Sequence, residues 1–259
     1  MRCVDLTEAG LALACLTAAA WAQAGDPRWQ FTTGVDSSSG KYGGSDTTEI
    51  RYVPFTLRYN AEPWQFKLTV PYVTIRSTGG TIIGYDDNGV PIRSGGGARS
   101  TESGLGDVVA SATCSLVERR ELLLDMTAKI KFGTASASKG LGTGELDAAL
   151  GFDAYFPLGR ATPFLSLAYR MPGNPPGQDL RNTRQAGLGL AYRISDHWNA
   201  GGMWEWRSAA TSAGQDQRDL TLYVVYKSGH DWKLQGYLSK GFSDASADYG
   251  VGLMATLNY

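Results

Sequence analysis

Two histidines are the first residues to weigh for catalysis, because hydrolases commonly use an imidazole to activate their nucleophile. The chain contains only His197 and His230. They lie in the short polar segments Ser195–His197 and Ser228–Asp231, whose composition is typical of tight turns. Turn positions apart from any predicted cleft favour a structural role, so the sequence predicts no enzymatic activity.

A metal site would need clustered His, Cys or carboxylate ligands, and the sequence displays no such cluster. Asp86-Asp87-Asn88-Gly89 is faintly similar to a calcium loop but lacks the downstream ligand spacing. The same residues stand between β-prone runs, which predicts a hairpin turn. A pair of acids for glycoside hydrolysis in a polar interior remains an alternative, although no sequence feature identifies such a pair. We therefore predict no metal site and no cofactor.

Charged side chains alternate with large apolar ones along several segments, which places the two kinds on opposite faces of a strand. We predict that the charged face lines the interior of a barrel. Its members by this alternation are Arg58, Lys67, Asp107, Asp125, Lys129, Lys131, Glu145, Asp147, Asp153, Arg170, Arg193, Glu205, Arg207 and Lys233.

Both signs of charge occur in this set, which leaves two arrangements open. Acidic and basic walls that face each other would set up a transverse field and favour small polar or zwitterionic solutes. Alternatively, the charges pair across the interior and close it. Alternation along a strand does not give distances across a barrel, so the sequence does not decide between them.

Twelve segments with period-two alternation must position these side chains. Each has about nine to fourteen residues, the length that a tilted strand needs to cross a bilayer. They are Trp29–Ser38, Glu49–Asn60, Trp64–Ile75, Gly104–Val117, Leu122–Gly133, Glu145–Phe156, Ala161–Met171, Arg184–Ile194, Trp198–Arg207, Asp219–Lys227, Trp232–Phe242 and Tyr249–Tyr259.

Short turns and longer Gly/Ser-rich loops alternate between these segments along the whole chain. An even strand number with this alternation predicts an all-β, transmembrane antiparallel β-barrel with periplasmic turns and extracellular loops. The longest loop, Arg76–Ser103, either extends above the membrane or folds inward as a constriction.

The apolar faces decide between a membrane barrel and a soluble one. A membrane barrel turns Leu188, Leu190, Leu253 and Leu257 outward to lipid, whereas a soluble barrel turns them inward. Aromatic residues near the segment ends, such as Trp64 and Trp198, are typical of an interfacial girdle. We therefore predict that the apolar face meets hydrocarbon; a soluble exported barrel is the alternative.

Residues 1–24 have the features of a secretory signal peptide, with an apolar run at Leu11–Ala22 followed by small residues. We predict export to the outer membrane and a mature barrel over residues 25–259. Cys114 is then the one cysteine left, which excludes an intrachain disulfide. The net charge of −1 gives no basic excess for binding nucleic acid.

The last segment, YGVGLMATLNY, alternates apolar residues and ends on an aromatic one. It resembles the terminal strand that the barrel assembly machinery reads in bacterial outer-membrane proteins. Ser103–Val108 (SGLGDV) and Lys131–Gly151 (KFGTASASKGLGTGELDAALG) resemble a family of outer-membrane transporters linked to phenol degradation, the MetA-pathway family. The resemblance implies a channel for small solutes, aromatic or polar, embedded in outer-membrane lipid. A non-conducting structural or adhesive barrel that acts through its outer loops is the alternative.

Overall fold

The computed structural model describes residues 28–259 apart from 87, 96 and 230. The predicted signal peptide and His230 therefore lie outside the described residues. Within the described part, no helix is long and apolar enough to cross a membrane.

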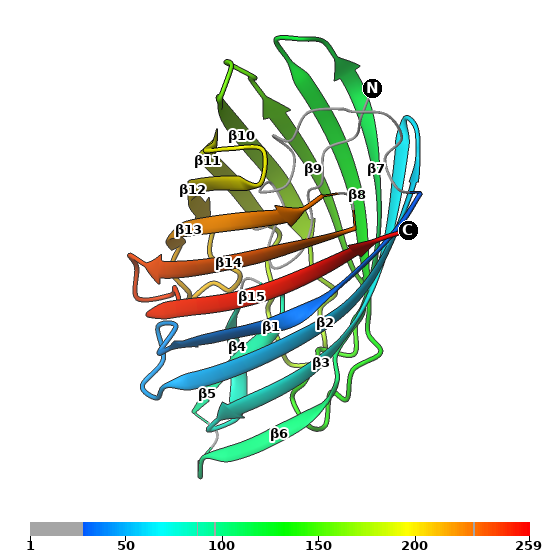
Figure 1. Ribbon diagram of the computed structural model, residues 1–259. Helices are drawn as coiled ribbons and strands as arrows, with labels where there is room; N and C mark the ends of the chain where they lie inside the picture. The colour runs from blue at the N-terminus through cyan, green and yellow to red at the C-terminus, as the bar shows by residue number, and fades with distance from the viewer. Residues whose placement is uncertain (1–27, 87, 96, 230) are drawn as a thin grey trace.

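The described chain folds almost entirely into antiparallel strands (Figure 1). Their bounds are β1 Trp29–Gly40, β2 Thr48–Ala61, β3 Trp64–Ser77, β4 Gly80–Tyr85, β5 Pro91–Gly95, β6 Ser100–Leu105, β7 Val108–Glu118, β8 Leu123–Phe132, β9 Asp147–Tyr155, β10 Ala161–Met171, β11 Thr183–Arg193, β12 Trp198–Arg207, β13 Gln217–Ser228, β14 Trp232–Gly241 and β15 Tyr249–Asn258.

The sheet closes on itself because β1 pairs with β2 on one side and with β15 on the other. The β1–β15 ladder runs without interruption from Gln30 opposite Asn258 to Ser39 opposite Tyr249. β3 pairs with β6 and β7, while β4 and β5 pair only with each other. The other strands pair with their neighbours along the chain, so the result is a closed antiparallel barrel of 12 strands. The predicted fold class and strand number are confirmed.

One predicted strand, Gly104–Val117, is divided in the structure into β6 and β7, and β6 begins earlier than expected, at Ser100. Both pieces pair with β3, and between them Gly106 and Asp107 form a bulge. Gly106 approaches β3 so closely that a Cβ atom would lie 2.7 Å from Val73 Cγ2. The bulge directs the Asp107 carboxylate into the barrel.

The two ends of the barrel differ as the loop lengths predict. Tight connections join β2 to β3, β7 to β8, β9 to β10, β11 to β12 and β13 to β14, and we call this the short-turn end. The other connections are longer and define the long-loop end.

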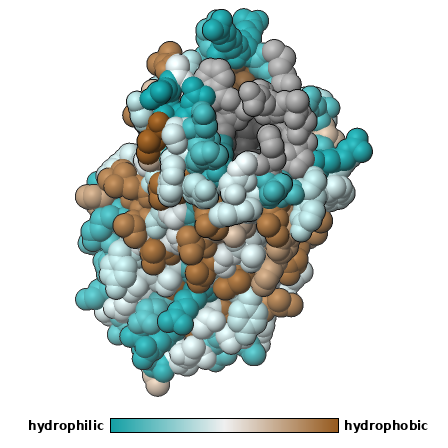
Figure 2. Space-filling view, viewed as in Figure 1, coloured by the Kyte–Doolittle hydropathy of each residue, from teal (hydrophilic) through white to brown (hydrophobic). Residues whose placement is uncertain are grey.

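The outer wall is apolar. Leu188, Leu190, Leu253 and Leu257 all lie on it with 44–64% of their surface exposed. Hydrophobic residues gather in a band across the middle of the visible face, and hydrophilic residues lie toward both ends (Figure 2). The expectation that the apolar face turns outward is confirmed.

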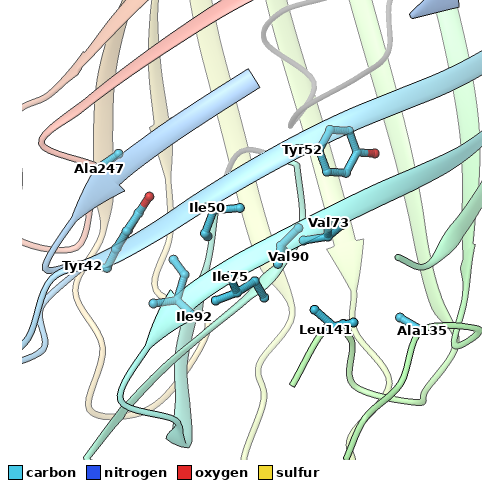
Figure 3. Close-up of a cluster of buried hydrophobic side chains, with 10 residues drawn as sticks. All are labelled: Tyr42, Ile50, Tyr52, Val73, Ile75, Val90, Ile92, Ala135, Leu141 and Ala247. Atoms are coloured by element: carbon cyan, nitrogen blue, oxygen red, sulfur yellow. The ribbon is translucent and has the colours of Figure 1, made fainter. Parts of the chain in front are cut away.

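The interior also contains an apolar cluster at the long-loop end, which the sequence did not predict. Ile50 and Tyr52 of β2 and Val73 and Ile75 of β3 point inward and pack against the inserted loop (Figure 3). The full cluster is Tyr42, Ile50, Tyr52, Val73, Ile75, Val90, Ile92, Ala135, Leu141 and Ala247.

The longest loop folds into the barrel instead of extending above it. Strands β4 and β5 form a hairpin whose turn is closed by a hydrogen bond from the Gly89 amide to the Asp86 carbonyl, 3.0 Å. Tyr85, Asp86, Val90 and Ile92 of this hairpin are buried. Strands β4 and β5 lie within the ring of barrel strands (Figure 1). Of the two alternatives for this loop, the inward one is observed, and the predicted hairpin turn is confirmed.

Candidate functional site

The charged residues predicted to line the interior occupy inward positions of the strand ladders. Nine of the thirteen that lie in strands or at the bulge are buried: Arg58, Lys67, Asp107, Asp125, Lys131, Asp147, Asp153, Glu205 and Arg207. Lys129, Arg170, Arg193 and Lys233 are partly buried. Glu145 differs, because β9 begins only at Asp147 and Glu145 therefore belongs to the preceding loop.

Two further acids, Asp36 of β1 and Asp219 of β13, also point inward and were not among the predicted residues. Both stand on the face opposite large apolar neighbours such as Val35 and Leu222. The alternation rule that found the others would have identified them. It could not have identified Asp86 and Asn88, because these reach the interior only through the inserted hairpin.

The hairpin tip is held by polar contacts to four strands of the wall. Asn88 Nδ2 donates to Asp36 Oδ1 of β1, 3.0 Å. Arg207 Nη1 of β12 donates to the Asp86 carbonyl, 3.4 Å, and Gln217 Nε2 of β13 to the Tyr85 carbonyl, 2.9 Å. These contacts fix the tip across the interior.

The fourth strand, β10, contributes Arg170, whose guanidinium carbon lies 4.1 Å from the centre of the Tyr85 ring. This geometry is that of a cation–π contact. The Tyr85 hydroxyl is neutral at physiological pH even at its ordinary pKa, and burial raises that pKa further. The contact therefore joins a permanent cation on the wall to an uncharged ring on the hairpin.

An ion-pair network near the hairpin joins the bulge at Asp107 to β8, β9 and β10. Lys131 Nζ is 2.6 Å from Asp107 Oδ2 and 3.7 Å from Asp147 Oδ2. Arg170 Nη2 donates to the same Asp147 oxygen at 2.5 Å, and the Gly173 amide donates to Asp147 Oδ1 at 3.0 Å. Asp147 is thus shared by two cations and a loop amide.

A second network lies on β11, β12 and β13. Arg207 Nη2 donates to Glu205 Oε1, 2.9 Å, and Arg207 Nη1 to Gln217 Oε1, 2.8 Å. Gln185 Nε2 also donates to Glu205 Oε1, 3.2 Å. Both networks consist of near neighbours on the wall and do not span the interior.

A cavity of about 50 Å³ lies beside the hairpin tip, between it and parts of these two networks. Asp86, Asn88 and Gly89 cover it from the hairpin side. Lys129, Lys131, Asp147, Arg170, Gln185 and Arg207 contribute its polar wall. The space suits a few water molecules or a small polar group rather than an extended ligand.

Asp147 is the residue whose loss should most disturb the first network. We expect Asp147→Ala to lower the free energy of unfolding by about 3 kcal/mol, because the buried Lys131 and the partly buried Arg170 lose a shared partner. Urea titration of the refolded barrel measures the change. Asp46→Ala, an exposed loop acid, is the matched control, and an equal effect of both variants would contradict this role.

No described residues form a group of three or more potential His, Cys, Asp or Glu metal ligands. His197 lies in the turn between β11 and β12, where its Nδ1 donates to the Lys227 carbonyl, 2.9 Å. This contact joins two neighbouring turns at the short-turn end. The imidazole therefore has the structural role that its turn position predicts.

No known family profile matches the sequence, and no curated protein sequence matches it either. Solved structures do match. An outer membrane channel from Pseudomonas putida F1 superposes with a TM-score of 0.69 at 12% identity, over 92% of this chain and 97% of that chain. This chain has the fold of a bacterial outer-membrane β-barrel. The predicted resemblance to bacterial outer-membrane β-barrels is confirmed at the level of the fold.

Two further channels have folds similar to that of this barrel. The NanC porin matches with a TM-score of 0.57 and 8% identity, over 89% of this chain and 99% of that chain. The CymD monoaromatic hydrocarbon channel matches with a TM-score of 0.50 and 10% identity, over 91% of this chain and 89% of that chain. At these identities the likeness concerns the fold of the barrel.

Proposed function

We propose that this protein is a passive outer-membrane channel for small solutes and acts without a cofactor or a catalytic step. The observation that carries the proposal is the sidedness of the wall, apolar outside and charged inside, around a hairpin that narrows the interior. Hydrocarbon favours contact with the apolar outer wall, and water or polar solutes favour contact with the charged inner wall.

Twelve strands suit a narrow or restricted passage. Barrels of eight strands are filled by their own side chains, whereas barrels of sixteen enclose an open aqueous channel. The inserted hairpin and the small cavity beneath it are consistent with an intermediate case. Small aromatic or polar compounds are the solutes that fit this size, and the channels with similar folds support that class.

The cellular setting belongs to the same proposal. Outer-membrane lipid surrounds the apolar wall, the short turns face the periplasm, and the long loops face the medium. The signal peptide at residues 1–24 directs export. The barrel assembly machinery then recognises β15, Tyr249–Asn258.

Single-channel recording in a planar lipid bilayer tests the proposal. Purified, refolded barrel should produce discrete current steps in potassium chloride. Heat-modifiable migration in gel electrophoresis must first verify that the barrel is folded. Folded protein that inserts into the bilayer and never conducts would contradict the channel.

The competing function is a non-conducting structural or adhesive barrel that acts through its long loops. It predicts no current and unchanged solute uptake in a deletion strain. The channel predicts current and slower uptake of its solute in that strain.

A further inference from the structure

Acidic residues form a row across neighbouring strands of the inner wall. Asp125 of β8 lies opposite Asp153 of β9, and Glu205 of β12 lies opposite Asp219 of β13. Between these pairs the same register runs through Ser166 of β10 and Gly187 of β11. We call this the acidic row; it is one continuous line of cross-strand neighbours.

Cations form a second, parallel row nearer the long-loop end. Arg58 of β2 lies opposite Lys67 of β3, and the register continues through Ser111 of β7 to Lys129 of β8. It then passes through Ala149 of β9 to Arg170 of β10. We call this the cationic row, and none of its members is acidic.

A strip of uncharged residues, most of them small, separates the two rows. Thr127 lies between Asp125 and Lys129 on β8, and Ala168 lies between Ser166 and Arg170 on β10. The register Thr113–Thr127–Gly151–Ala168–Gln185 connects these positions across five strands. We call this the neutral strip. Acid and cation on one strand are four residues apart, about 13 Å between Cα atoms.

The strip is inclined to the barrel axis because the strands are staggered. The cationic row begins at Arg58, close to Ala61 where β2 ends at the short-turn end. It finishes at Arg170, next to Met171 where β10 ends at the long-loop end. The strip therefore leads toward the cavity beneath the hairpin, which Gln185, Lys129 and Arg170 help to line.

One acid in the row has a buried carboxylate oxygen without a protein donor. Asp153 has 1% of its surface exposed, and its Oδ1 accepts a hydrogen bond from Ser166 Oγ, 2.5 Å. Its Oδ2 has no hydrogen-bond partner in the part of the chain that the structure describes. A buried carboxylate oxygen without a donor is costly unless something supplies one. A positive charge nearby, such as an ammonium group at the strip, would offset part of that cost through space.

We propose that the neutral strip is a binding track for small zwitterions, with the ammonium end of the solute toward the acidic row and the carboxylate end toward the cationic row. This inference rests on the proposed channel function and names its substrate class. A transverse field aligns a dipolar solute along the field. A solute with a single charge is stabilised electrostatically beside one row and destabilised beside the other.

Two paired variants test the track. Asp125→Asn with Asp153→Asn neutralises part of the acidic row, and Lys67→Gln with Lys129→Gln neutralises part of the cationic row. Lys240→Gln, an exposed outer-wall residue, is the control. Asp219→Asn is a second acidic-row variant in case the double acid variant fails to fold. Reversal potentials in a potassium chloride gradient give the ratio of potassium to chloride permeability.

We expect the acidic-row and cationic-row substitutions to shift the ratio of potassium to chloride permeability in opposite directions. A unit charge about 10 Å away in water changes the local concentration of an ion about twofold, so two charges give about fourfold. The acid variants should lower the potassium-to-chloride ratio, the cation variant should raise it, and Lys240→Gln should leave it unchanged. Shifts in the same direction, or no shift in a channel that still conducts, would overturn the track.

Liposome swelling supplies the solute test with a matched pair. Glycine is a zwitterion at neutral pH, and glycolamide is its uncharged isomer of the same composition. Wild-type barrel should pass glycine at least about twofold faster than glycolamide, and both row variants should bring this ratio toward one. A wild-type ratio of one or less in a conducting barrel refutes the track and leaves the channel intact. A barrel that never conducts refutes the channel and the track together.

Discussion

Removal of the β4–β5 hairpin should raise the single-channel conductance of the barrel by about threefold or more. The variant replaces Gly80–Gly95 with a short Gly-Ser linker. The hairpin occupies the interior and is held there by contacts of Tyr85, Asp86 and Asn88 to the wall. Without it, the interior of a twelve-stranded barrel should be wide enough for hydrated ions. Planar-bilayer recording of the variant beside the wild type measures the change.

The control places the same linker at the other end of the barrel, in the turn at Arg119 and Arg120. These residues lie between β7 and β8 and are exposed, so conductance should remain at the wild-type level. Equal conductance of the hairpin variant and the wild type would mean that the hairpin does not limit the current. Loss of the folded state would instead show that the apolar cluster around Val90 and Ile92 is needed for stability.

Leu188→Arg should destabilise the barrel in lipid by about 2–4 kcal/mol. Leu188 lies in the middle of β11 on the outer wall with 64% of its surface exposed. An arginine there would place a guanidinium in hydrocarbon, where its charge and donors lose their hydration. Equilibrium unfolding in urea from phospholipid vesicles measures the loss.

Leu158→Arg is the matched control for that substitution. Leu158 is exposed to the same degree, 66%, but it lies in the turn between β9 and β10, where a charge can reach the headgroups. We expect Leu158→Arg to destabilise the barrel by only about 0–1 kcal/mol. Equal costs for the two variants would show that the middle of the wall does not contact hydrocarbon.

The strands were predictable because alternation and turn composition are local properties of the sequence. Ala161–Met171 and Trp198–Arg207 have the observed bounds, and the outward leucines follow from alternation alone. The division of the predicted strand Gly104–Val117 was not predictable in the same way. It depends on the close packing of Gly106 against Val73, a contact between segments distant in sequence.

The candidate site was predictable as a set of inward charges but not as an arrangement. Alternation places Asp153 and Lys129 on one face, yet their rows depend on the register between strands, which a single strand does not encode. For a related reason, the sequence did not decide whether the hairpin extends above the membrane or folds into the barrel. Its inward course depends on partners such as Arg170 and Gln217, which lie far along the chain.

The ladder between β1 and β15 has a consequence for the order of folding. Its partners, such as Gln30 and Asn258, come from opposite ends of the described chain, so this ladder closes the largest possible loop. Topologies with such distant contacts fold slowly, and an unclosed barrel leaves the backbone groups of two strands unpaired. The barrel therefore cannot close until β15 is present, and one edge of β1 stays unpaired until then. An unpaired edge is a template for pairing with another chain, so β15 also protects β1 from such pairing.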